Sequence, residues 1–224
     1  MLEHPIQRSR NAPHPARKGE QVAAAARALF LEHGFTETSM DAIARRAAVS
    51  KATLYAYFPT KEALFASLIE AECAAVDEGV VLPDLALGLR EALRAFAVRY
   101  VAVFMDGSAA AFFRVIAAEN GRFPDLCALF VKSGPQKAVA RCAQLLTTAR
   151  DDGLLDFVDA EIAATQFLSL VRGDLPLHSA LGVRFQFGDS VERVIDAGID
   201  VFLRAYAQGL PPTSPRGIAR GIGP

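Results

Sequence analysis

The sequence contains no long hydrophobic run, and its first residues are not expected to form a secretory leader. A membrane-spanning helix needs about 18 or more apolar residues in a row, and the most apolar stretch, 109–118, is broken by Arg114. The first ten residues include Glu3, Arg8 and Arg10 and no apolar segment. Hydrophobic residues still make up 52% of the 224 residues. We therefore expect a soluble, cytoplasmic protein that contacts no membrane and buries these residues in a core, a subunit interface or a ligand cavity.

Cysteine is scarce, and the motifs of common enzyme and metal sites are absent. Cys73, Cys127 and Cys142 are odd in number and form no C-x-x-C pair, which argues against a disulfide framework and a zinc site. No H-E-x-x-H, P-loop, G-x-S-x-G or G-x-G-x-x-G pattern occurs. We therefore expect no catalytic residues, no metal and no cofactor. The alternative, an all-helical enzyme, would be favoured by a metal or cofactor that co-purifies with the protein.

The net charge of −1 hides an uneven distribution of charge along the chain. Residues 1–65 contain nine Lys or Arg against six Asp or Glu, whereas residues 66–224 contain fifteen against nineteen. Only the first third is therefore a candidate for binding a polyanion. Within it, residues 1–18 combine four basic residues with three prolines, and we expect a disordered basic arm there. Such an arm is either a solvated tail or a contact to a phosphate backbone.

Apolar residues recur at helical spacing from residue 20 onward. The first predicted helix ends at Gly34. Two short helices, 40–47 and 51–58, follow on either side of a tight turn at 48–49, and a long helix runs from 60 to 79. This spacing is typical of a helix-turn-helix; the alternative is an ordinary helical hairpin in an all-helical core.

The rest of the chain is also predicted to be helical, with no convincing strand alternation. The expected helices cover residues 84–105, 109–120, 125–132, 135–152, 160–172 and 190–208. Residues 210–224 are rich in Gly and Pro and are expected to form a disordered tail. We therefore predict an all-α protein of about nine helices.

The short helix at 51–58 has one face suited to a DNA groove. Leu54 and Phe58 fall on one side and dock the helix on the bundle. The opposite side carries Lys51, Ala52, Thr53, Tyr55 and Ala56. Small residues permit close approach, Lys neutralises phosphate, and hydroxyls bond phosphate oxygens or base edges.

The helix starts strengthen this interpretation. Ser39, Ser50 and Thr60 each begin a predicted helix, where free N–H groups can bind phosphate. Lys61 lies in the first turn of the helix after Thr60, where a cation is unfavourable to the helix dipole. A nearby anion would explain its presence.

The segment GFTETSMDAIARRAAVSKATLYAYFPTKEALF, residues 34–65, closely resembles the DNA-binding domain of TetR/AcrR-family transcriptional regulators. The resemblance covers roughly residues 19–66. The downstream residues are similar to the C-terminal domain of the AefR-like branch through Phe113–Arg114, Ala118–Glu119, Phe123–Pro124, Gly153–Leu154, Ala163 and Phe167. The resemblance implies a helix-turn-helix DNA-binding domain at 19–66 and a larger helical effector-binding and dimerisation domain at 67–209.

The resemblance also implies roles for particular residues. Ser39 would bind phosphate; Lys51, Ala52 and Thr53 would face bases and adjacent phosphates; and Tyr55, Tyr57 and Lys61 would clamp the DNA backbone. Three positions depart from the family pattern, since 48 and 52 are often Gly and 56 is usually larger, whereas all three are Ala in this chain. A left-handed conformation at Ala48 would cost about 1 kcal/mol. The base specificity of relatives is therefore not transferable.

The C-terminal part is expected to contain an effector pocket and a dimer seam. The candidate pocket residues are mostly aromatic: Phe96, Tyr100, Phe104, Phe113, Arg114, Phe130, Gln166 and Phe167. The candidate dimer residues lie at helical spacing on the last two long helices: Phe167, Leu170, Val171, Val194, Ile195, Ile199, Phe202 and Tyr206. Ordinary monomer core is the alternative for both sets.

These features together predict a DNA-binding transcriptional regulator. The resemblance implies a homodimeric repressor that leaves a palindromic operator when a small, largely apolar effector binds, so that DNA and effector binding are negatively coupled. The remaining alternative is a ligand-binding or scaffold protein whose helix-turn-helix no longer binds DNA.

Overall fold

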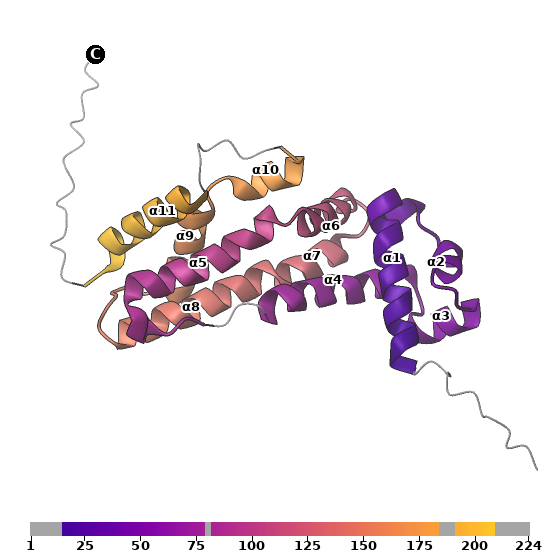
Figure 1. The fold of residues 1–224 in the computed structure, drawn as a ribbon, viewed down its shortest axis with the longest axis horizontal. Helices are drawn as coiled ribbons and strands as arrows, with labels where there is room; N and C mark the ends of the chain where they lie inside the picture. The colour runs from indigo at the N-terminus through magenta and orange to yellow at the C-terminus, as the bar shows by residue number, and fades with distance from the viewer. Residues whose placement is uncertain (1–14, 79–81, 184–190, 209–224) are drawn as a thin grey trace, which may run out of the picture. The chain divides into compact units, whose positions relative to one another are not determined.

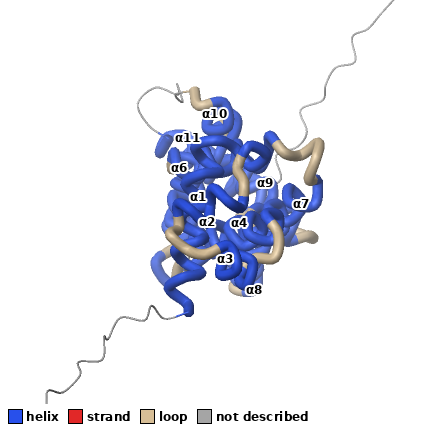
Figure 2. The backbone as a smooth tube through the Cα atoms, turned by 90° about the vertical axis from the view of Figure 1, so that its right-hand side faces the viewer, coloured by secondary structure: helices blue, strands red, loops and turns tan. Residues whose placement is uncertain are grey.

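A computed structural model describes residues 15–78, 82–183 and 191–208. These residues form eleven α-helices and one 3-10 helix, and an isolated bridge between Leu155 and Ala207 is the only β-type pairing within them (Figures 1 and 2). The all-α prediction is confirmed, although the helices outnumber the nine expected. The expected tail at 210–224 and residues 1–14 of the expected arm lie outside the described residues.

The first four helices follow the predicted order. They are α1 (Pro15–Glu37), α2 (Met40–Arg46), α3 (Lys51–Tyr57) and α4 (Lys61–Glu78). Helix α1 begins before the predicted start, so residues 15–18 belong to it and not to the arm. Gly34 interrupts α1 with φ 80° and ψ 169°, a conformation that glycine adopts at little cost, as expected for the end of the first helix.

Two differences from the predicted helices lie further along the chain. The expected helix at 84–105 is divided by Gly88, which has φ 102°, into the 3-10 helix η1 (Leu85–Leu87) and α5 (Leu89–Met105). Helix α10 (Leu175–Leu181) was not predicted, because Pro176 was interpreted as a break. Pro176 lies in the first turn of α10, where proline is tolerated since the N–H groups there have no partner within the helix.

The remaining helices agree with the predicted ranges within two residues at each end. They are α6 (Gly107–Ala118), α7 (Pro124–Ser133), α8 (Pro135–Asp151), α9 (Ala160–Arg172) and α11 (Val191–Tyr206).

The helices divide into two compact units. The first unit contains α1–α4, α6, α7 and α10; the second contains η1, α9, α11 and most of α5 and α8. The first unit extends past the expected boundary at 66/67, since α4 and α6 pack on α1, and α7 packs on α4.

An aromatic cluster holds the first unit together. The rings of Phe30 and Phe35 on α1 lie 5.0 Å and 4.8 Å from the ring of Phe65 on α4. Phe112 on α6 lies 5.5 Å from Phe65, and Phe123 lies 5.0 Å from Phe35. Such ring pairs stabilise a core beyond their buried area. Helices α1, α4 and α6 therefore share one core beneath the helix-turn-helix.

Close packing of α9 against α11 organises the second unit. A Cβ added at Gly198 would lie 2.7 Å from the carbonyl oxygen of Leu170, so only glycine permits this approach. Phe167 and Phe202 are fully buried with ring centroids 5.0 Å apart. On the other side of α11, Arg94 of α5 pairs with Asp196 at 3.0 Å. Helix α11 is thus fixed to both α9 and α5.

Candidate functional site

Serine side chains begin both helices of the helix-turn-helix, as predicted. Ser39 Oγ accepts a hydrogen bond from Ala42 N–H at 3.1 Å, and Ser50 Oγ accepts one from Thr53 N–H at 3.1 Å. Ser50 and Thr53 also share a hydrogen bond between their hydroxyls at 2.8 Å. Ser39 is exposed and Thr53 is half-buried, so of these two predicted DNA contacts the Ser39 residue is the more accessible to solvent.

The turn between α2 and α3 places Ala48 in the left-handed region. Its φ is 51°, and it is the one non-glycine residue with positive φ in the described part of the chain. The backbone on either side is satisfied, since Val49 N–H donates to the Ala44 carbonyl at 3.1 Å. The expected cost of an alanine at this position is therefore present, although the turn itself is formed.

Helix α3 presents the mixed face that the sequence predicted. Leu54 is fully buried and Phe58 is half-buried, so they anchor the helix. The exposed positions are Lys51, Ala52, Tyr55, Ala56 and Tyr57. Tyr55 is 47% exposed, so its ring and its hydroxyl are accessible to a partner. Figure 1 shows α2 and α3 as successive short helices beside α1.

Two ion pairs neutralise much of the positive charge on this surface. Lys51 Nζ lies 2.6 Å from Asp41 Oδ2. Arg46 donates to both carboxylate oxygens of Glu32, at 2.7 Å and 2.8 Å, and this hydrogen bonding lowers the pKa of Glu32. Arg45 is exposed next to Arg46. These cations can exchange their carboxylate partners for DNA phosphates.

The structure gives Lys61 a role different from the predicted backbone clamp. Its ammonium donates to the carbonyl oxygens of Phe35, Thr36 and Thr38, at 2.8, 3.1 and 2.9 Å, and lies 4.4 Å from the centroid of the Phe35 ring. All three N–H donors of the ammonium are thereby used within the chain. These carbonyls supply a negative partner within the chain, so Lys61 fixes the end of α1 to the start of α4, and its contact with the DNA backbone stays a prediction.

A buried carboxylate joins the same region to α6. Glu119, only 9% exposed, accepts from the Thr36 hydroxyl at 2.9 and 3.0 Å and from the Thr36 N–H at 3.3 Å. Arg122 donates to Thr36 Oγ1 at 3.3 Å. Arg27 of α1 similarly pairs with Glu72 of α4, and this hydrogen bond is the largest cause of the raised pKa of Arg27. Sequence reasoning missed these links, since each joins residues at least 45 positions apart.

The predicted pocket residues are distributed over both units. In the first unit, Phe113 and Phe130 lie 5.6 Å apart, Arg114 donates to the Ser179 carbonyl at 3.1 Å, and Phe104 is half-buried. Phe113 is 37% exposed. The Phe113 and Phe130 rings therefore form an accessible aromatic pair, whereas Arg114 already bonds within the chain.

In the second unit, the predicted pocket residues have different surroundings. Phe96 and Phe167 are buried in the core. Gln166 is exposed and accepts from the Tyr206 hydroxyl. Burial raises the pKa of Tyr100, whose oxygen accepts from Arg172 at 3.3 Å.

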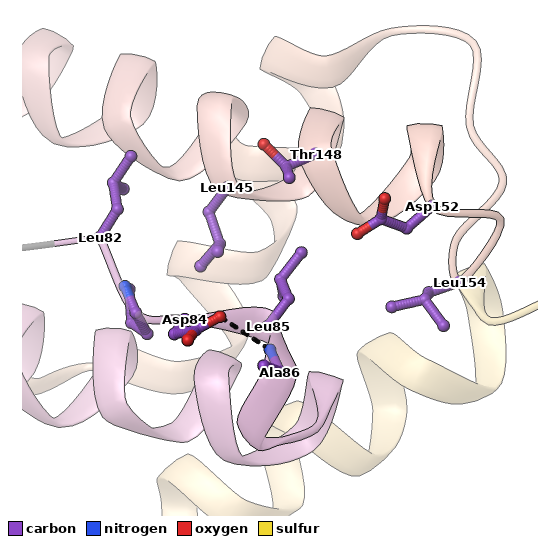
Figure 3. A pocket seen from close by; sticks show the side chains of 9 residues that line it. Leu82, Asp84, Leu85, Ala86, Leu145, Thr148, Asp152 and Leu154 are labelled. Carbon is purple, nitrogen blue, oxygen red and sulfur yellow. Dashed lines mark hydrogen bonds between the residues drawn. The ribbon is translucent and has the colours of Figure 1, made fainter.

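An open groove in the second unit is lined by none of the predicted residues. It has a volume of about 550 Å³ and is lined by Leu82, Pro83, Asp84, Leu85, Ala86, Leu145, Thr148, Asp152 and Leu154 (Figure 3). The Asp84 carboxylate accepts from the Ala86 N–H at 2.9 Å and begins η1, so it serves the local fold.

Most of the predicted dimer residues face the interior of their own subunit. Phe167, Val171, Ile195, Ile199 and Phe202 are at most 2% exposed within the single chain. They therefore form the core between α9 and α11 and are corrected from interface to core. Leu170, Val194 and Tyr206 are half-buried.

The outward faces of the same two helices carry a different apolar set. Ile162 on α9 is 55% exposed and Val201 on α11 is 50% exposed. Ala197 and Ala205 lie four residues before and after Val201 and are also exposed. Residues at this spacing share one helix face. These exposed residues, and not the buried ones, are therefore the candidates for a contact between two subunits along α9 and α11.

The sequence matches two protein-family models. Residues 22–68 match the N-terminal model for bacterial regulatory proteins of the tetR family. Residues 91–208 match the C-terminal domain of AefR-like transcriptional repressors. In the described residues no single helix is both long and apolar enough to cross a bilayer; α5 and α6 satisfy the criterion only together, as a bent pair.

Solved and curated proteins give the same result. The flavonoid-responsive regulator FrrA has 52% sequence identity, a TM-score of 0.80, and an alignment covering 87% of this chain and 99% of FrrA. EthR of Mycolicibacterium smegmatis, a helix-turn-helix transcriptional regulator, is 36% identical over 74 residues, 32% of this chain and 34% of EthR. FasR of the same organism, a transcriptional activator, is 32% identical over 87 residues, 39% of this chain and 35% of FasR. The alignments thus span about a third of these two curated relatives.

Proposed function

The chain belongs to the TetR family of bacterial transcriptional regulators, and on that basis we propose that it binds a palindromic operator as a homodimer, with α3 in the major groove. The face of α3 is the observation that supports this most strongly. Leu54 anchors the helix from below, while Lys51, Ala52 and Tyr55 are exposed. An amine, a methyl group and a phenol side by side serve both phosphates and base edges.

Each exposed group on this surface has its own role in the proposal. Lys51 reaches a guanine edge or an adjacent phosphate, and Ala52 contacts a thymine methyl. Ser39, Tyr55 and Tyr57 hydrogen-bond phosphate oxygens and fix the register of the helix on the duplex. Thr53 contributes its hydroxyl at the edge of the contact, since Ser50 already holds it. Phosphate contacts position the protein, whereas base contacts specify the sequence.

A dimer is needed because one helix of seven residues reads few base pairs. We place the subunit contact on the outward faces of α9 and α11, along Ile162, Ala197, Val201 and Ala205. Two helices from each subunit would then form a four-helix bundle. The small side chains of α11 permit close approach of its symmetry-related copy.

For the effector, we propose a planar aromatic compound of the flavonoid class. The support is the 52% identity with FrrA, a flavonoid-responsive regulator, over almost the whole of that protein. Phenolic rings stack on aromatic side chains and hydrogen-bond polar groups, and the Phe113–Phe130 pair and the Tyr100–Arg172 pair offer these chemistries in their respective units. The effector bound to the chain would weaken operator binding, so that the protein acts as a cytoplasmic repressor.

The test is a fluorescence-anisotropy titration of DNA upstream of the protein's own gene, with scrambled DNA of the same composition as the control. We expect a strong preference for the upstream DNA and its loss on adding a flavonoid. A long-chain fatty acid tests the largely apolar alternative in parallel. Release by the fatty acid alone would overturn the effector class but leave the DNA-binding function intact, whereas equal affinity for both DNAs would overturn the function itself.

A further inference from the structure

The charge on the recognition helix is neutralised by the chain itself. Lys51 is the only charged residue of α3, and its ammonium lies 2.6 Å from the carboxylate of Asp41 on α2. Both side chains are more than half exposed, at 65% and 54%. An exposed ion pair of this kind contributes little to stability, because solvent screens it and both side chains lose freedom. Folding alone therefore does not explain the pair.

The position of Asp41 is unfavourable for DNA binding in general. A carboxylate beside the groove-facing lysine repels phosphates and competes with them for the ammonium. Asp41 does lie in the first turn of α2, where it complements the helix dipole, but that effect requires no contact with Lys51. Asp41 therefore weakens phosphate binding and pairs with Lys51, and neither the stability of the fold nor the helix dipole explains why it does both.

We propose that Asp41 is a positioning residue that increases the discrimination between operator and other DNA; this inference rests on the proposed DNA-binding function. On non-specific DNA, Lys51 would exchange one anion for another and leave Asp41 unpaired near the phosphates, so the gain is small. On the operator, the O6 and N7 atoms of a guanine are neutral acceptors, so Lys51 can donate to them with one N–H and keep Asp41 with another. Asp41 thus weakens non-specific binding more than operator binding.

Arg45 keeps a general attraction to DNA without Lys51, because it is exposed and lies four residues after Asp41, on the same face of α2. Arg46 adds less, since Glu32 on α1 already holds it in an ion pair. Because non-specific affinity depends on the number of phosphates neutralised, holding Lys51 in an ion pair removes about one from that number.

The experiment compares wild type with Asp41→Asn on operator and scrambled DNA over a range of salt concentrations. For the variant, affinity for scrambled DNA should rise roughly three- to eightfold at about 0.1 M salt, and the slope of log K against log salt should steepen by about 0.9. Operator affinity should rise less, so the ratio of the two affinities falls. Asp41→Glu should restore the wild-type ratio.

Two controls separate the ion pair from net charge. Glu70→Gln removes the same charge from an exposed position on α4, about 14 Å along the helix from its start, and should leave the slope unchanged. In a Lys51→Ala background, Asp41→Asn should have no more effect than Glu70→Gln.

Three results would each overturn the inference: an unchanged slope in Asp41→Asn, equal gains on both DNAs, or a full effect of Asp41→Asn without Lys51. If wild type itself fails to prefer the operator, the proposed function fails, and that result is visible before any variant is compared.

Discussion

Replacing Ala48 by glycine should stabilise the protein. At φ 51°, an L-residue costs about 1–2 kcal/mol relative to the right-handed region, and glycine does not pay this cost. The greater conformational freedom of glycine in the unfolded chain lowers the free energy of unfolding by about 0.4–1 kcal/mol. The net gain in free energy of unfolding is therefore about 0.5–1 kcal/mol. For a chain of this size, this corresponds to a rise in Tm of about 1–4 °C.

The assay is urea or thermal unfolding by circular dichroism at one fixed protein concentration, since dimerisation makes stability depend on concentration. Ala24→Gly is the matched control, because Ala24 is exposed within α1 and should lose about 1 kcal/mol on the same substitution. A loss of stability in Ala48→Gly comparable to that in Ala24→Gly would refute the left-handed turn. Operator affinity should be retained, because the turn is already formed.

Three further variants test the remaining assignments. Lys51→Ala should weaken operator binding by about 1–3 kcal/mol in anisotropy titrations, and unchanged affinity in a folded variant would remove Lys51 from the interface. Lys61→Met should lower the free energy of unfolding by about 2–3 kcal/mol, because three carbonyls lose a charged donor, and leave the salt dependence of DNA binding unchanged; a flatter dependence would restore the phosphate clamp. Gly198→Ala should destabilise by about 1–3 kcal/mol in urea, because its Cβ meets the Leu170 carbonyl, and an unaffected midpoint would contradict the close approach of α9 and α11.

Local features of the fold could be predicted from the sequence because their causes lie within a few residues. Ser39 and Ser50 begin helices through hydrogen bonds to N–H groups three residues ahead. Gly34 ends a helix through its own backbone freedom. Helical periodicity also predicted which face of α3 is buried, because Leu54 lies on one side of the helix and its polar neighbours lie on the other. Helix α10 was missed because Pro176 resembles a terminator unless its place in the first turn is known.

Features that depend on distant partners could not be predicted. The three carbonyls that bind Lys61 lie 23 to 26 residues before it. The sequence showed a cation in an unfavourable position at the start of a helix but did not show which groups compensate its charge. Glu119 and Thr36 are 83 residues apart. The apolar residues of α11 were predicted to lie at a dimer seam or, as the alternative, in the core, because periodicity does not reveal whether an apolar face meets its own subunit or another copy. The packing of α9 on α11 in the structure is what shows that this face meets its own subunit.

The spacing of half-sites tests the central claim most directly. A dimer with two copies of α3 requires half-sites about one helical turn, or a multiple of it, apart on the duplex. Inserting about half a turn of DNA between the half-sites moves them to opposite sides of the helix, and a titration should then show binding no tighter than to scrambled DNA. Equal affinity for the native and the half-turn operators would contradict the symmetric presentation of α3 by two chains.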